Sequence, residues 1–109
     1  MIRVVPINNI YITRGDYARI PYKLTDQDGN EYTPEEGDRL VLTVKTDTSQ
    51  SSYVLQKEIK DGALILQPED TEHLAFGRYA YDVELRKDGG IVHTVSAPHI
   101  IKICKEVNT

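Results

Sequence analysis

The sequence predicts an all-β protein, a sandwich of two antiparallel sheets with about seven strands. The clearest sign is the segment 77–87, where apolar residues alternate with charged ones, as in a strand that is buried on one face only. Asp-Gly pairs separate segments of this kind, because glycine permits the positive φ of a tight hairpin turn. These pairs are Asp28-Gly29, Asp61-Gly62 and Asp88-Gly89. Short strands at this spacing favour a sandwich over an open sheet.

The expected strands follow one another with short polar connections. We expect them at 9–14, 17–25, 39–45, 53–59, 63–67, 77–87 and 91–104. Pro98 predicts a bulge or an edge position in the last of these, since proline cannot donate to a strand ladder. The expected core positions alternate along the strands and are Ala18, Ile20, Tyr22, Leu24, Leu40, Leu42, Val44, Leu64, Leu66, Tyr79, Tyr81, Val83 and Leu85. Each large side chain that becomes fully buried contributes about 1.5–3 kcal/mol.

Two short helical turns are expected between the strands. The first covers 33–36, with Thr33 as the N-cap, Pro34 as the first helical residue and Glu36 as the capping-box partner. The second covers 68–74 and begins with acidic residues, which the helix dipole favours. Tyr79 follows this second turn and resembles a tyrosine corner, in which the hydroxyl reaches back to the preceding connection.

Size and composition limit the class of protein. The 109 residues predict one domain, 1–109, long enough to bury roughly two-thirds of its unfolded surface. The net charge is −4 and the charges are interspersed, so nucleic acid is not an expected partner. Cys104 is the only cysteine, which excludes a disulfide within the chain. No segment approaches the ~20 apolar residues of a membrane helix, and the first residues lack the apolar core of a signal peptide.

Three motifs suggest chemistry, but each is better explained by ordinary structure. Arg14-Gly15-Asp16 resembles an adhesion tripeptide and is expected to be a tight turn. The segment 26–31 carries alternating carboxylates, yet Glu31 and Gly37 stand where a calcium loop requires glycine and glutamate. The histidines show no spacing typical of zinc ligands. They are His73, His93 and His99.

No catalytic signature is present in the sequence. Nucleophile elbows, phosphate-binding glycine loops and zinc-protease motifs are all absent. The carboxylate pairs lie in polar turns, where little pKa tuning is expected. We therefore expect a protein that is not an enzyme, with no catalytic residues, no metal and no cofactor.

The seven tyrosines leave a second interpretation open. Tyr11, Tyr17, Tyr32 and Tyr53 lie near expected strand starts and turns, where exposed rings could form a binding platform. Packing of these rings, with the hydroxyls at the rim of the sandwich, is the favoured explanation. The alternative function is therefore a carbohydrate- or adhesion-binding β-sandwich module.

The order of the motifs resembles one known group of domains. The matching segments are Ile10-x-Ile12-x-x-Gly15-Asp16, Leu24-Thr25-Asp26-Gln27-Asp28-Gly29-Asn30, Asp38-Arg39-Leu40-Val41-Leu42-Thr43-Val44-Lys45, Asp61-Gly62-Ala63-x-x-Leu66-x-Pro68-Glu69-Asp70-Thr71-x-x-Leu74, Gly77-x-Tyr79-x-Tyr81-Asp82-Val83-x-Leu85, Ile91-x-x-Thr94 and Ile101-x-Ile103. Together they resemble the immunoglobulin-like domains of tailed phages and prophages, in particular the N-terminal domain of baseplate upper proteins. The resemblance covers about 7–107. In baseplate upper proteins further segments follow this domain, whereas this sequence stops at Thr109.

The resemblance implies an immunoglobulin-like sandwich that serves as a structural or adaptor protein of a phage or prophage particle. Its expected partners are other virion proteins and further copies of itself, and its expected location is the virion, assembled in the bacterial cytoplasm. The family brings no catalytic residues. We expect the docking surface on the charged face of the strand 77–87, at Arg78, Asp82, Glu84 and Arg86. Contact by surface complementarity or by strand pairing at a sheet edge would serve this role.

Overall fold

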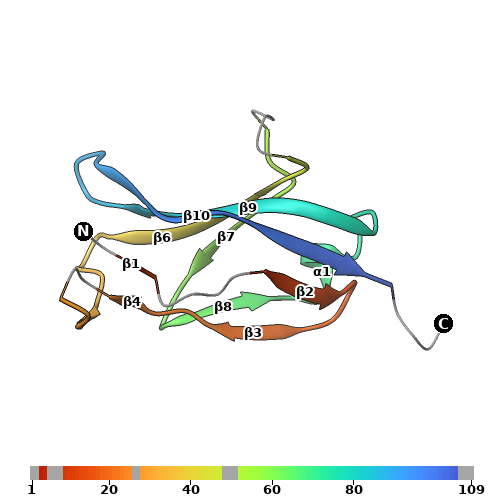
Figure 1. Cartoon of the computed structure of the whole chain (residues 1–109), viewed down its shortest axis with the longest axis horizontal. Helices are drawn as coiled ribbons and strands as arrows, with labels where there is room; N and C mark the ends of the chain where they lie inside the picture. The colour runs from red at the N-terminus through yellow and green to blue at the C-terminus, as the bar shows by residue number, and fades with distance from the viewer. Residues whose placement is uncertain (1–2, 5–8, 26–27, 48–51, 106–109) are drawn as a thin grey trace.

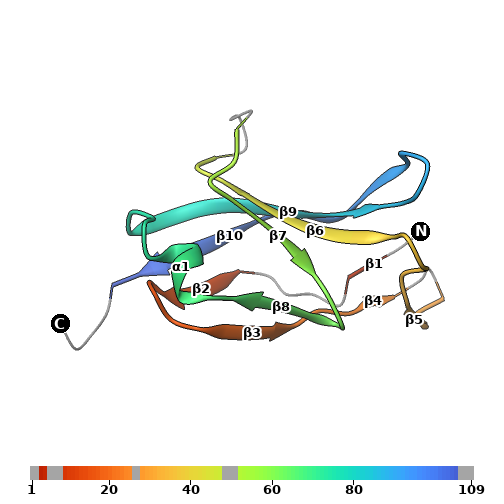
Figure 2. The same cartoon turned by 180° about the vertical axis from the view of Figure 1, so that it is seen from behind.

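A computed structural model describes residues 3–4, 9–25, 28–47 and 52–105. Two layers of strands face one another, as Figures 1 and 2 show from opposite sides. The elements in chain order are β1 (Arg3–Val4), β2 (Ile10–Thr13), β3 (Ala18–Pro21), β4 (Leu24–Thr25), β5 (Glu31–Tyr32), β6 (Arg39–Lys45), β7 (Leu55–Ile59), β8 (Ala63–Leu66), α1 (Pro68–Thr71), β9 (Gly77–Arg86) and β10 (Val92–Cys104). The protein is thus a β-sandwich with one short helix among the described residues.

The topology of the two layers is immunoglobulin-like, as predicted. One layer is a five-stranded sheet in the order β2-β10-β9-β6-β7, in which β2 runs parallel to β10 and all other neighbours are antiparallel. The other layer contains the pair β3-β8 and the three-stranded sheet β1-β4-β5. Because β1 pairs with β4 while β2 pairs with β10, the chain changes layers between Val4 and Ile10. This division of strands between two Greek-key sheets is that of the immunoglobulin fold.

The core lies between the layers and is built from the alternating positions. In β9, Tyr79, Tyr81, Val83 and Leu85 are buried while the residues between them are partly exposed. The opposite layer contributes Tyr22, Leu24, Leu64 and Leu66, all at most 5 % exposed. These predicted core positions are confirmed. Ala18 and Ile20 are only partly buried, because β3 lies at the open side of a two-stranded sheet.

The tyrosine corner is present. The Tyr79 hydroxyl donates a hydrogen bond of 2.7 Å to the carbonyl of Ala75, four residues earlier. Helix α1 leads into this corner, and the Asp70 carboxylate accepts from the backbone N–H of Gln67 at 2.7 Å. Thr71 at the end of α1 is fully buried, and its hydroxyl accepts from the N–H of Gly15 at 2.8 Å. This hydrogen bond therefore ties the turn after β2 to helix α1.

Two predictions about local structure need correction. The expected strand 17–25 divides into β3 and β4, because β3 pairs with β8 whereas β4 pairs with β1 and β5. The segment 33–36 is not helical. Asp38, and not Thr33, organises it: the Asp38 carboxylate accepts from the N–H of Glu35 at 3.0 Å, and the Asp38 N–H donates to the Glu35 carbonyl at 3.0 Å. This closed turn leads straight into β6.

The hairpin turn predicted at Asp61-Gly62 is confirmed. Asp61 and Gly62 both have positive φ, 54° and 74°, and connect β7 to β8 through reciprocal hydrogen bonds between Lys60 and Ala63. This is the geometry that a two-residue hairpin turn requires. The register of β10 shifts between Thr94 and Ser96 and again between Ser96 and His99, which agrees with the irregularity expected near Pro98.

Candidate functional site

The four predicted docking residues lie on one face of the molecule. Arg78, Asp82, Glu84 and Arg86 occupy the positions of β9 that alternate with the core residues, so they lie on the outer face of the five-stranded sheet. β9 is the third of the five strands, so these positions run along the middle of that face. Figures 1 and 2 show the second layer on the opposite side only.

At one end of this face the charges are paired with one another. Arg86 contacts Glu84 at 3.1 Å, and on the neighbouring strands Arg39 contacts Glu58 at 2.8 Å and Lys60 contacts it at 3.4 Å. The hydrogen bond from Arg39 also lowers the pKa of the Glu58 carboxyl below its usual range. We call this region, Arg39, Glu58, Lys60, Glu84 and Arg86, the paired end. Each of its charges is paired with a neighbour of opposite sign.

The paired end covers an unexpected buried residue. Val41 is 2 % exposed, although it points away from the core between Leu40 and Leu42, which point inward. Its register partners on the two sides are Glu84 and Glu58. Since opposite residues of neighbouring strands lie close together, the charged side chains and their stems cover Val41. Thr43, the next outward residue, is also buried and accepts from the Gln56 amide at 3.1 Å.

Asp82 is a partly buried member of the predicted docking residues. It lies opposite Thr43 in the register of β6 and β9. Burial raises its pKa above the usual range, the negative charge of Glu84 adds to this, and Lys45 partly opposes it. Asp82 therefore carries its charge at a desolvation cost.

The opposite end of the outer face has a different character. Lys102 of β10 lies between Arg78 of β9 and Tyr11 of β2, and both are its register partners. Tyr11 is 66 % exposed. Nearby, the Arg14 guanidinium lies 4.0 Å from the centre of the Phe76 ring, which is 45 % exposed. We call these five residues the basic–aromatic end. Among the described residues, none of its three cations forms an ion pair.

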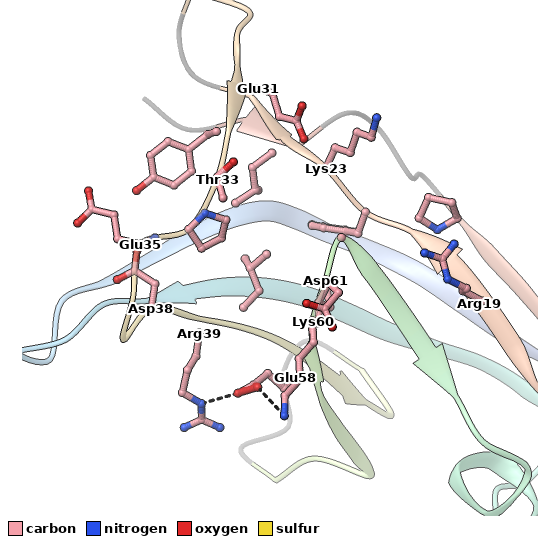
Figure 3. A pocket seen from close by; sticks show the side chains of 18 residues that line it. Arg19, Lys23, Glu31, Thr33, Glu35, Asp38, Arg39, Glu58, Lys60 and Asp61 are labelled. Carbon is pink, nitrogen blue, oxygen red and sulfur yellow. Dashed lines mark hydrogen bonds and ion pairs between the residues drawn. The ribbon is translucent and has the colours of Figure 1, made fainter.

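A hollow of about 790 Å³ opens between the layers near the paired end. Its inner wall includes the buried Tyr22, Leu24, Leu40 and Ile59, and charged residues line its mouth. Figure 3 shows Glu58 between Arg39 and Lys60 on one side of the mouth. Glu58 contacts both cations, so all three charges of this group are engaged with one another at the mouth.

A second charge cluster fixes the wall of this hollow. The Lys87 ammonium donates to Asp38 at 2.9 Å and to the Tyr32 hydroxyl at 3.2 Å. The hydrogen bond from Lys87 lowers the pKa of Asp38, and the same bond raises the pKa of Lys87. The Asp38 side chain is 4 % exposed. This cluster connects the end of β9 to the turn before β6 and has a structural role.

The edge strand β7 carries a charge on its inner side. Lys57 lies opposite Leu42, a core residue, and therefore points toward the interior side of the sheet. Its ammonium contacts the Asp70 carboxylate in α1 at 3.0 Å. This contact joins the edge of the five-stranded sheet to the helix.

The remaining sequence motifs are placed apart from one another. Tyr11 and Tyr53 are more than half exposed but belong to opposite edges of the five-stranded sheet. Tyr17, also more than half exposed, lies in the connection between β2 and β3. Tyr32 is half-buried and bound to Lys87. The tyrosines therefore form no single platform among the described residues.

The histidines and carboxylates are also dispersed. His73 and His93 are exposed, and the His99 ring lies 5.9 Å from that of Tyr81, whose pKa burial raises to about 12. In the described part of the chain, no group of three or more histidine, cysteine or acidic side chains could hold a metal ion. Asp26, the first residue of the calcium-like segment, lies outside the described residues. Arg14-Gly15-Asp16 forms the expected turn, with the Asp16 N–H bonded to the Thr13 carbonyl at 3.1 Å.

Comparison with known proteins adds little beyond the fold. No protein-family model and no curated protein sequence matches the chain significantly. A similar solved structure is that of the fibronectin(III)-like modules of CbhA from Clostridium thermocellum, with 12 % identity, 97 % of this chain and 96 % of that one covered, and a TM-score of 0.44. A similarity at this level carries no inference about what this chain binds. No helix in the described residues is long and apolar enough to cross a membrane.

Proposed function

We propose that the chain is a non-catalytic structural or adaptor protein of a phage or prophage particle, placed in the baseplate, the tail or the virion surface. It acts through contacts with other virion proteins and is assembled into the particle in the bacterial cytoplasm. The ordered motifs that resemble phage immunoglobulin-like domains support the phage assignment. The surface of the molecule supports the contact role.

The observation that carries the contact role is the uncovered outer face of the five-stranded sheet. Val41 and Thr43 are already buried there beneath the charges, so the face is preformed and a partner need not order it. Arginine and tyrosine, the residue types that contribute most to binding at protein interfaces, both lie on it as Arg78 and Tyr11.

The proposal is tested by locating the protein in particles released after prophage induction. We expect antibody against the chain to label purified particles at a fixed position by immunogold microscopy, and the protein to sediment with them. Arg78→Glu together with Arg86→Glu should lower its incorporation, because both charges lie on the proposed contact face. Arg19→Glu, an exposed position on β3 in the other layer, serves as the matched control. A protein that stays entirely in the soluble host fraction would overturn the proposal.

A second candidate, a carbohydrate- or adhesion-binding module, is favoured by one observation. Tyr53 is 56 % exposed beside the start of β7, where a sugar ring could stack on it. This function predicts signals on a glycan array that weaken on Tyr53→Ala. A blank array with the folded wild-type protein would count against it.

A further inference from the structure

We propose that copies of this chain associate head to tail, with the basic–aromatic end of one copy bound to an acidic end of the next. The proposal names a partner for the contact face and rests on the contact role given above, but not on the phage assignment. It follows from the different charges at the two ends of the molecule.

The molecule is elongated, with extents of 46 × 27 × 21 Å. In Figure 1 the long axis is horizontal, and β2, α1 and the end of β10 lie at one end while β4 lies at the other. Figure 2 shows β5 beside β4 at that second end. Residues carried by β5 and the turn after it are therefore far from residues carried by β2 and the start of β9.

The end formed by β5 and the following turn is acidic. Glu31, Glu35 and Glu36 are all exposed, and none of them forms an ion pair with a described residue. We call these three residues the acidic end. The whole chain has a net charge of −4, so a basic surface on it is exceptional and an acidic one is readily available on another copy.

The basic–aromatic end has the composition of a binding surface. Arg78 and Lys102 are adjacent in register and have no acidic partner in the part of the chain that the structure describes, so their charges remain available to a second molecule. Tyr11 and Phe76 add exposed apolar area beside them. The Phe76 ring is held by Arg14, whose guanidinium also donates to the Leu74 carbonyl at 3.5 Å, so little side-chain freedom is lost on binding.

Charge also decides the direction of association. Contact between two copies of the basic–aromatic end would place Arg78 and Lys102 against like charges, which is costly. Contact between unlike ends places the cations of one copy against the carboxylates of the next. Such a heterologous contact repeats from copy to copy and produces a ring if the rotation closes, or a filament if it does not.

The test is sedimentation velocity of the purified wild-type chain over a range of concentrations at about 50 mM and about 500 mM sodium chloride, because salt screens exposed charges. We expect concentration-dependent association at low salt that weakens by about tenfold or more at high salt. A wild-type chain that remains monomeric at the highest concentration in low salt would overturn the inference.

Two charge-reversed variants make the test specific. Arg78→Glu with Lys102→Glu reverses the basic–aromatic end, and Glu31→Lys with Glu35→Lys reverses the acidic end. Each variant alone should be monomeric, because both of its ends then carry the same sign of charge. An equimolar mixture of the two should associate again, since unlike ends are restored between different molecules. Association of either variant alone, or none in the mixture, would contradict the geometry proposed.

The control variant carries Arg19→Glu and Lys23→Glu, which changes the net charge by the same amount as reversal of the basic–aromatic end. It leaves that end intact and should still associate. Circular dichroism and thermal melting establish that every variant is folded. The two proposals fail separately: incorporation into particles without head-to-tail association refutes only the inference, and association of a chain never found in particles refutes only the phage assignment.

Discussion

The two ends of the outer sheet face differ in whether their charged side chains form ion pairs with one another. At the paired end, Glu84 pairs with an arginine, Glu58 pairs with an arginine and a lysine, and the two carboxylates lie on either side of the buried Val41. At the basic–aromatic end, Arg78 and Lys102 are neighbours next to an exposed Tyr11 and have no acidic partner among the residues described. The same sheet thus satisfies its own charges at one end and leaves them for a partner at the other. Cross-strand register decides the difference, because it places glutamates beside the cations at one end and a tyrosine beside them at the other.

Replacing Val41 should give the largest difference between the ends. Val41→Asp places a carboxylate between Glu58 and Glu84 at a buried site, and we expect it to lower the free energy of unfolding by about 3 kcal/mol or more. Tyr11→Asp, at an exposed position, should change it by no more than about 0.5 kcal/mol. Urea unfolding followed by circular dichroism measures both. Equal losses would show that the paired end does not bury Val41.

Tyr79→Phe should loosen the basic–aromatic end selectively. It removes the hydrogen bond to Ala75, directly before Phe76, and we expect a loss of about 1 kcal/mol in the free energy of unfolding. Hydrogen exchange should rise at residues 74–77 and remain unchanged in β6 and β7. Tyr11→Phe is the control, since Tyr11 is mostly exposed. If exchange rises uniformly, the hydroxyl supports the whole fold rather than this corner.

The pH dependence of stability should have opposite signs at Asp82 and Asp38. Burial and Glu84 raise the pKa of Asp82, so the contribution of this group to stability is lost as the pH rises from the unfolded-state pKa of about 3.9 through the higher folded-state pKa. Lys87 lowers the pKa of Asp38, so its contribution is present above about 3.9 and is lost as the pH falls through the lower folded-state pKa.

Two amide variants isolate these contributions. Relative to wild type, Asp82→Asn should gain stability as the pH rises through the first range, and Asp38→Asn should lose stability as the pH rises through the second. Denaturant midpoints measured from acid to neutral pH give both differences. Curves parallel to wild type would mean that neither carboxyl has a shifted pKa.

The smallest effect is expected from the Glu84–Arg86 pair. A double-mutant cycle with Glu84→Ala and Arg86→Ala should give a coupling of about 0.2–1 kcal/mol, because the pair is partly exposed. The coupling should shrink in high salt. A coupling of zero at low salt would mean that these two charges do not stabilise the paired end together.

Local patterns predicted much of the fold. Alternation identified β9 and its buried face, and the position of Tyr79 after an acidic turn indicated the tyrosine corner. The Asp61-Gly62 hairpin followed from backbone preference alone. The two-residue strands β1 and β5 were not predicted, because such short segments carry no periodicity. Thr33 was wrongly taken as a helix cap, since only the structure shows that Asp38 binds the N–H of Glu35.

The candidate surface was predicted only in part. The side of the sheet on which Arg78, Asp82, Glu84 and Arg86 lie follows from period two within one strand. The residues that lie beside them on other strands cannot be predicted in this way. Lys102 reaches Tyr11 through the parallel register of β10 and β2, which are separated by most of the chain, and no local pattern encodes that register. The burial of Val41 is likewise a consequence of which charges lie beside it.

The inward Lys57 on β7 has a consequence for solubility. An edge strand with free backbone groups is a template for edge-to-edge aggregation, and natural proteins protect such edges with charges that point inward. A foreign strand added at β7 would enclose the Lys57–Asp70 contact in an apolar environment, where it is costly to keep. Lys57→Val should therefore leave the fold intact while making concentrated solutions of the protein aggregate.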